Sequence, residues 1–240
     1  MLSALTKTAP SSRENPSPPV SRQRDAYHHG ALKEALIEAS ESVLAERGVD
    51  GFSLREVARR SGVSPAAPAH HFGDKEGLLV EVARNAFAGL TAELEAGNQP
   101  GGADPVARLR EQGLGYVGFA LKHPGRFGLM FRSGLRRDEA LMGSAREAYL
   151  KLEDGVRLLL SVPSKQPLDK SQHQALLALW SAVHGFAHLL LAGQFDGSAP
   201  SGGREAFLRQ NLASMLQQQI EGLRDASQFP VTPSPVRRSS

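Results

Sequence analysis

The stretch that decides the fold reads GFSLREVARRSGVSPAAPAHHFGDKEGLL and runs from Gly51 to Leu79. Ser53 and Glu56 have the spacing of a capping box, which predicts that a short helix begins there. Gly62 then favours the left-handed backbone conformation that ends a helix. Ser64 is followed by a proline, and this pair predicts the start of a second helix. Two helices joined by so short a turn predict a helix-turn-helix, whose second helix projects outward to enter a DNA major groove.

The segments on either side of this stretch complete a small module. Apolar residues recur at helical spacing between Leu32 and Gly48, with charged residues opposite, which predicts an amphipathic support helix. After Phe72 the chain breaks, and Asp74 caps a fourth helix predicted from Lys75 to about Ala96. The positive end of that helix favours a nearby DNA phosphate.

The rest of the chain predicts a second helical region beyond the Gly/Pro-rich segment from Asn98 to Ala103. Ser171 and Gln174 have capping-box spacing and open a segment that is apolar nearly all round, which requires cover on most sides. We find neither strand alternation nor an internal repeat. The helices predicted here run from Asp104 to a residue before Pro124, from Phe127 to Phe131, from Asp138 to about Leu160, from Ser171 to about Gln194 and from Arg204 to about Arg224.

These patterns predict an all-α protein with an N-terminal three-helix helix-turn-helix DNA-binding domain and a C-terminal helical domain. The predicted limits are a disordered tail at 1–25, the helix-turn-helix domain at 26–73, a linking helix at 74–97, the C-terminal helical domain at 104–224, and a second disordered tail at 225–240.

The helix-turn-helix stretch resembles the DNA-binding domain of the TetR family of bacterial repressors. The residues that carry the resemblance are Ser53 to Ala58, Ser61 to Ser64, His71, Phe72, Lys75 and Leu78. The resemblance implies a homodimer that binds double-stranded operator DNA and is released by a small-molecule effector. It also implies that the C-terminal helical domain at 104–224 is the ligand-binding and dimerisation domain. The DNA-binding residues that it implies are Ser53, Arg55, Ser64, Pro65, Ala66, Ala67, His70, His71 and Lys75. His71 has an alternative role, which is to brace the turn at Phe72.

Two positions depart from the family pattern. Where the family has an apolar residue and then a Tyr that reaches a phosphate, this chain has Pro68 and Ala69. One expected phosphate contact is therefore missing. Pro68 also disfavours helical angles at Ala67, which predicts a distorted first turn of the reading helix.

A second resemblance lies at Trp180, His184 and Gly185. Their spacing is similar to that of the C-terminal domain of one TetR branch, named for these Trp-His-Gly residues. Aromatic and histidine side chains in this region are candidate effector contacts, and the alternative for each is an ordinary place in the core. The candidates are Tyr116, Phe119, Phe127, Phe131, Tyr149, Trp180, His184 and His188.

The composition excludes some other functions. The chain has no Cys, so thiolate metal sites and Cys nucleophiles are excluded. Its net charge of +3 is too modest to indicate DNA binding by itself. His184 and His188 lie at i, i+4, which leaves a metal-sensing regulator as an alternative, but Gly185 stands where a zinc peptidase has its Glu. A helical interaction module without DNA binding is the other alternative. We expect a cytoplasmic regulator that is not an enzyme, uses no cofactor and has no membrane partner.

Overall fold

Every regular element in the described residues is a helix, so the predicted fold class is confirmed. A computed structural model describes residues 20–98, 102, 104–132, 134–135, 138–197 and 203–228, with side chains described from Ala31 to Asp225. The helices are α1 (Val20–Arg47), α2 (Leu54–Arg60), α3 (Ala67–Phe72), α4 (Lys75–Ala96), α5 (Pro105–Lys122), α6 (Pro124–Met130), α7 (Glu139–Leu159), α8 (Lys170–Leu191), α9 (Gly203–Phe207), a π-helical turn (Leu208–Leu212) and α10 (Ala213–Gln228).

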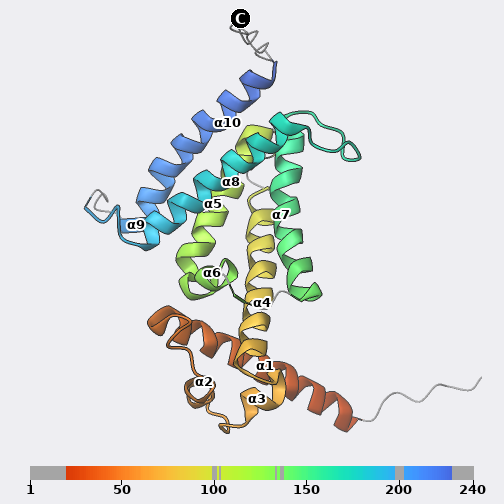
Figure 1. The fold of residues 1–240 in the computed structure, drawn as a ribbon, viewed down its shortest axis with the longest axis vertical. Coiled ribbons are helices and arrows are strands. Elements are labelled where there is room, and N and C mark those ends of the chain that lie inside the picture. Colours follow the sequence, from red (N-terminus) through yellow and green to blue (C-terminus); the bar gives the residue numbers. More distant parts are fainter. Residues whose placement is uncertain are drawn as a thin grey trace, which may run out of the picture.

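The helices form two groups that α4 connects. Helices α1 to α3 form one end of the molecule, and α5 to α8 with α10 form the other (Figure 1). Helix α4 packs on α1 and α3 at its beginning and on α5, α6 and α7 along the rest of its length. The two groups also meet directly, because α6 lies against α1.

Helix α4 begins and ends where the sequence predicts. The Asp74 carboxylate accepts a hydrogen bond from the Gly77 amide at 2.7 Å, which satisfies one of the free N–H groups of the first turn. Apolar residues recur along the whole helix, and those that are buried include Leu78, Val82 and Leu90. Because this helix shares its core with both groups, the two groups are held in one orientation.

The start of α2 is correct, but the predicted capping box is wrong. Ser53 is extended, with φ −141° and ψ 128°, and its side chain makes no capping hydrogen bond. Glu56 instead accepts hydrogen bonds from Arg59 and Arg60, both at 2.9 Å. A charged guanidinium competes better for the carboxylate than a neutral backbone amide does.

The reading helix α3 begins later than predicted. Gly62 has φ +67°, as expected for the turn, but Ser64 does not cap a helix. Residues 64 to 67 form a turn, in which the Ala67 amide donates to the Ser64 carbonyl at 3.0 Å. The helix starts at Ala67 because Pro68 then occupies its first turn, where a missing amide costs no hydrogen bond. The reading helix therefore has only six residues.

Two features of the C-terminal helices also correct the predictions. The capping box of α8 is formed by Asp169 and Gln172 rather than by Ser171 and Gln174. The last predicted helix is interrupted by the π-helical turn at Leu208–Leu212.

Helix α8 is covered on one side only. Leu176, Leu179 and Val183 are buried, whereas Leu177 and Leu189 on the opposite face are 40% and 48% exposed. Among the described residues, α8 alone has the length and hydropathy of a membrane span. Its buried stripe packs against α5, α7 and α10, which is the packing of a core helix. The prediction that α8 is covered on most sides is wrong for this single copy of the chain.

The predicted tails overlap helices. Helix α1 begins at Val20, inside the tail predicted at 1–25, and α10 continues to Gln228. Residues 1–19 and 229–240 lie outside the described residues, as does most of the predicted boundary segment from Asn98 to Ala103.

Candidate DNA-binding surface and effector cavity

The predicted DNA contacts lie around α2 and α3 at one end of the molecule (Figure 1). Ser53, Arg55 and Pro65 line one shallow depression there. Most members of the predicted set are exposed, while Ser53, Ala67 and His71 are half-buried. The exposed members are Arg55, Ser64, Pro65, Ala66, His70 and Lys75.

The positive charge on this surface is smaller than a count of Arg and Lys implies. Hydrogen bonds from Arg59 and then Arg60 hold the pKa of Glu56 at about 2, so this carboxylate is ionised and cancels one of the two positive charges. Arg60 also donates to Glu46 at 2.7 Å. Lys75 is exposed, but its Nζ donates to the Val49 carbonyl at 3.2 Å.

Arg55 differs from these basic residues. It is exposed and forms no ion pair with any residue that the structure describes. Arg55 is therefore the cation best placed to take a phosphate without first breaking an internal contact.

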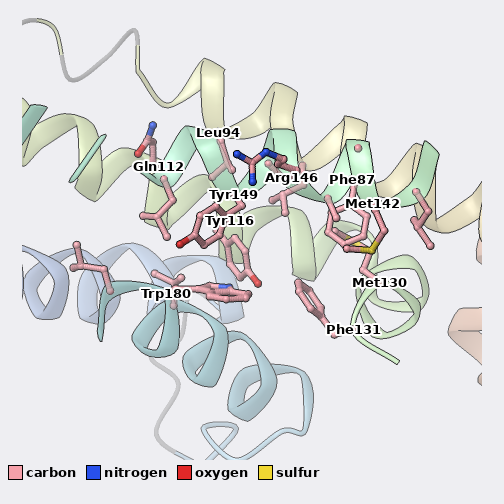
Figure 2. Close-up of a pocket in the computed structure, with 18 of the residues that line it drawn as sticks. Phe87, Leu94, Gln112, Tyr116, Met130, Phe131, Met142, Arg146, Tyr149 and Trp180 are labelled. Carbon is pink, nitrogen blue, oxygen red and sulfur yellow. The ribbon is translucent and has the colours of Figure 1, made fainter. Parts of the chain in front are cut away.

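An apolar cavity of about 650 Å³ lies between α4, α5, α6, α7 and α8 (Figure 2). This volume is typical of sites that enclose a drug-sized ligand. Four of the eight predicted effector contacts line it, namely Tyr116, Phe131, Tyr149 and Trp180. Sequence reasoning missed Phe87, Leu94, Gln112 and Arg146, which also line it, because nothing in their local pattern separates them from ordinary core or surface residues.

The other four predicted contacts are not in the cavity wall. Phe119 is buried beside Gly89, and Phe127 is completely buried in the core. His188 is exposed on α8. Helical spacing identifies an inward face but not which part of that face borders a void, so as effector contacts these residues stay predictions.

His184, the remaining candidate, lies behind Tyr116. The Tyr116 hydroxyl and His184 Nδ1 are 2.8 Å apart. Burial raises the pKa of Tyr116, and burial together with the neighbouring His188 lowers the pKa of His184. A neutral His184 accepting from the Tyr116 hydroxyl fits both shifts. Since Nδ1 is then engaged, and no three His, Asp or Glu of the described chain lie together as metal ligands, the metal-sensing alternative gains no support.

Helix α6 connects the cavity to the helix-turn-helix module. Met130 of α6 and the following Phe131 line the cavity. On the same short helix, Arg126 Nε lies 2.9 Å from Glu41 Oε2 of α1, and both side chains are mostly buried. Arg132 lines the cavity and also donates to Asp50 at 2.7 Å.

The backbones of α6 and α1 are in close contact at Gly125. A Cβ atom at Gly125 would lie only 2.7 Å from the Ala45 amide nitrogen, so no larger residue fits without moving one helix. A displacement of α6 by a molecule in the cavity would therefore be transmitted to α1 rather than absorbed between them.

An all-helical chain with a helix-turn-helix at one end and a partly open, ligand-sized apolar cavity at the other has the architecture of ligand-responsive transcriptional regulators. Two family models match it. Residues 36–82 match the model for "Bacterial regulatory proteins, tetR family", and residues 109–215 match "Tetracyclin repressor-like, C-terminal domain". The chain belongs to the TetR family, whose members are regulators and not enzymes. The C-terminal match is to a different model from the Trp-His-Gly branch, so that branch stays a prediction.

Individual relatives agree with this assignment. The transcriptional regulator BetI of Burkholderia ambifaria is 36% identical over 75 residues, which cover 31% of this chain and 39% of that protein. BetI of Rhizobium meliloti is 38% identical over 58 residues, which cover 24% of this chain and 29% of that protein. The chain thus spans about two fifths or less of the curated relatives that it matches.

Solved structures match over a greater length. A protein of unknown function from Rhodococcus sp. RHA1 has a TM-score of 0.59 and 30% identity, over 84% of this chain and 95% of that one. The TetR family regulator PfmR of Thermus thermophilus has a TM-score of 0.58 and 21% identity, over 76% of this chain and 97% of that one. The second match supports the fold alone.

The first prediction concerns the missing phosphate contact. Ala69 is exposed on α3, and Ala69→Tyr should tighten binding to a selected operator duplex by about tenfold, the value of one hydrogen bond to a charged group. Fluorescence anisotropy measures this affinity. Ala69→Phe is the matched control, because it adds the ring without the hydroxyl. Equal affinity for the Tyr and Phe variants would refute a missing hydroxyl contact.

The second prediction concerns the pair Glu41–Arg126. Burial outweighs the neighbouring Arg126 and raises the pKa of Glu41, so the residue stabilises the fold most at acidic pH and less as pH rises through its folded pKa. Arg126→Met leaves a buried carboxylate without its counter-charge and should lower the free energy of unfolding by about 2 kcal/mol at neutral pH. Adding Glu41→Gln should restore most of this loss.

Chemical denaturation of the single and double variants measures the effect. Arg204→Met is the control, because Arg204 and Asp196 form an exposed pair whose loss should change the free energy of unfolding little. Simple additivity of Arg126→Met and Glu41→Gln would show that the two side chains do not interact.

Proposed function

We propose that this protein is a homodimeric, sequence-specific transcriptional repressor that a small-molecule effector releases from its operator. The observation that carries this proposal is the dual position of α6, which borders the cavity through Met130 and contacts the helix-turn-helix module through Arg126. Family membership supports DNA binding and a repressing role. Such a regulator acts in the cytoplasm, where the DNA is.

The proposed DNA contacts are those predicted from the sequence, with Arg55 as the principal phosphate contact. The reading helix offers few groups for base recognition, since Ala66 and Ala67 present methyl groups and His70 one polar ring. Methyl groups contact thymine, and water and DNA shape supply further specificity. The limits of the helix-turn-helix domain, the linking helix at 74–97 and the C-terminal domain at 104–224, and membership of the Trp-His-Gly branch through Trp180 and His184, belong to the same proposal.

The proposed dimer forms through the exposed face of α8 together with α10. This face carries Leu177, Leu189 and, on α10, Met215, which are all more than a third exposed. Small residues such as Ser181 and Gly185 lie between the leucines, and they permit close approach of a second helix. Two copies paired here present two reading helices, one for each of two DNA half-sites that lie about 34 to 36 Å apart.

The effector acts by favouring one of two dimer conformations. A molecule that fills the cavity only when α6 is displaced shifts the population toward a form whose reading helices no longer match the half-site spacing. The size of the shift equals the difference between its affinities for the two forms.

The test of DNA binding is selection of duplexes from a random pool by the purified protein, followed by a salt titration of the best sequence. A palindromic site, bound less tightly as salt rises, is the expected result. Arg55→Gln should weaken binding and reduce the slope of log affinity against log salt by about 0.9, the loss of one phosphate contact. Arg209→Gln is the control, because Arg209 is also an exposed arginine but lies in the π-helical turn of the C-terminal region. A folded dimer that enriches no sequence would instead favour a helical interaction module.

The dimer interface is tested by Leu189→Glu. An unpaired carboxylate in the interface should convert the dimer to a monomer in sedimentation velocity and abolish operator binding. Leu158→Glu is the matched control, because Leu158 is similarly exposed, at 42%, but lies on α7. A Leu189→Glu variant that stays dimeric would place the interface elsewhere.

A further inference from the structure

The cavity has an apolar interior and a polar mouth on α7. Most of its buried lining residues are apolar, and Leu90, Leu109 and Val183 are typical of them. The lining residues of α7 that are exposed follow one stripe of this helix, which runs from Glu139 to Arg146. This exposed stripe is the mouth of the cavity. A bound molecule therefore places its apolar part inside and meets water along α7.

One hydroxyl group in the cavity wall is available to a ligand. Tyr149 is half-buried, and its ring packs edge-to-face on Trp180 with ring centroids 6.1 Å apart (Figure 2). Its hydroxyl forms no hydrogen bond with any residue that the structure describes, and it keeps accessible surface, unlike the sealed Oε1 of Gln112. The hydroxyl of Tyr116, in contrast, is engaged by His184 at 2.8 Å.

A guanidinium group lies next to this hydroxyl. Arg146 precedes Tyr149 by three residues, which places the two side chains on one face of α7. Burial and then Glu153 raise the pKa of the Tyr149 hydroxyl, whereas Arg146 lowers it, as a nearby positive charge does. Glu153 is itself held by Arg157 at 2.6 Å. Arg146 is exposed and forms no ion pair within the described part of the chain, so both neighbouring groups are free to donate to a ligand.

The position of this pair at the mouth favours an anionic group on the ligand. A carboxylate there keeps part of its hydration and gains a counter-charge, so it avoids the cost of burying an ion in the interior. Its two oxygens can accept from the hydroxyl and the guanidinium together, and such charge-assisted hydrogen bonds are stronger than neutral ones. Glu139 begins α7, about 15 Å along the helix axis from Tyr149, and solvent ions screen a charge at that distance.

We infer that the effector is an amphipathic carboxylate, whose apolar part fills the cavity and whose carboxylate accepts hydrogen bonds from the Tyr149 hydroxyl and the Arg146 guanidinium. This inference rests on the proposed function, because it names the chemical class of the effector that the cavity accepts. A neutral hydroxyl at the end of the same apolar body forms weaker hydrogen bonds with both donors. We expect the carboxylate to bind about ten times more tightly than the corresponding alcohol.

Three probes with the same flexible decyl chain separate the possibilities, namely decanoate, 1-decanol and decylamine, which is a cation at neutral pH. Trp180 is the single Trp of the chain and lines the cavity, so its fluorescence reports on occupancy directly. Calorimetry on the DNA-free protein provides the dissociation constants. Decanoate should bind most tightly and decylamine most weakly, because the ammonium group meets the Arg146 guanidinium.

Arg146→Gln should remove most of the preference for decanoate over decanol, and Tyr149→Phe should reduce it. Arg108→Gln is the matched control, because it removes one positive charge from α5 at a residue outside the cavity lining, and it should keep the full preference. Arg146→Glu should reverse the order, so that decylamine binds most tightly of the three.

Equal binding of decanoate and decanol to the unaltered protein would overturn the carboxylate class, as would tightest binding of decylamine or binding of none of the three. An Arg146→Gln variant that keeps the full preference would overturn the assignment of the carboxylate to this mouth.

Because these titrations contain no DNA, the two proposals fail separately. A protein that prefers decanoate through Arg146 but enriches no duplex would refute the regulator and keep the ligand class.

Discussion

The contact between α6 and α1 is the constraint on which the account of this molecule depends. Glu41 and Arg126 lie 2.9 Å apart with little exposure, and Gly125 brings the two backbones too close for any side chain to intervene. A buried ion pair of this kind adds little stability over an apolar contact, but it tolerates few alternative geometries. Together with α4, which shares a core with both groups of helices, it makes the position of the helix-turn-helix module depend on the packing around the cavity.

The DNA-binding surface has a different character from the cavity. Much of its positive charge is consumed internally, because Glu56 and Glu46 hold Arg59 and Arg60. These ion pairs fix the orientation of α2 and leave Arg55 as an exposed cation with no ion-pair partner among the described residues. A reading surface with few charges and a six-residue helix binds DNA through a small number of contacts per copy, so the second copy in a dimer contributes a large share of the affinity.

The sequence predicted the helices well where capping and periodicity agree. Asp74 and the apolar repeat after it placed α4 correctly, and Gly62 placed the turn. The prediction failed where two residues compete for one role, as Pro65 and Pro68 do for the first turn of α3, and as the Ser53 amide and the Arg59 guanidinium do for the Glu56 carboxylate.

The candidate site was less predictable than the fold. Tyr116 and Trp180 were found because aromatic residues in a ligand-binding domain are good candidates. The pair Glu41–Arg126 joins residues from distant parts of the chain, and its importance lies in burial that no local pattern encodes. His184 and Phe127 have the right type and helical face but pack one layer behind the wall.

The most direct test of this account is the distance between the two modules of a dimer, measured with and without a molecule in the cavity. The chain has no Cys, so Ser42→Cys on the exposed side of α1 provides one labelling position per copy for pulsed electron spin resonance. The account predicts a single narrow distance on the operator duplex and a shifted distribution when an apolar molecule, selected because it quenches Trp180 fluorescence, occupies the cavity. A distance that stays the same when such a molecule is bound would contradict the coupling of cavity to reading helices through α6 and α1.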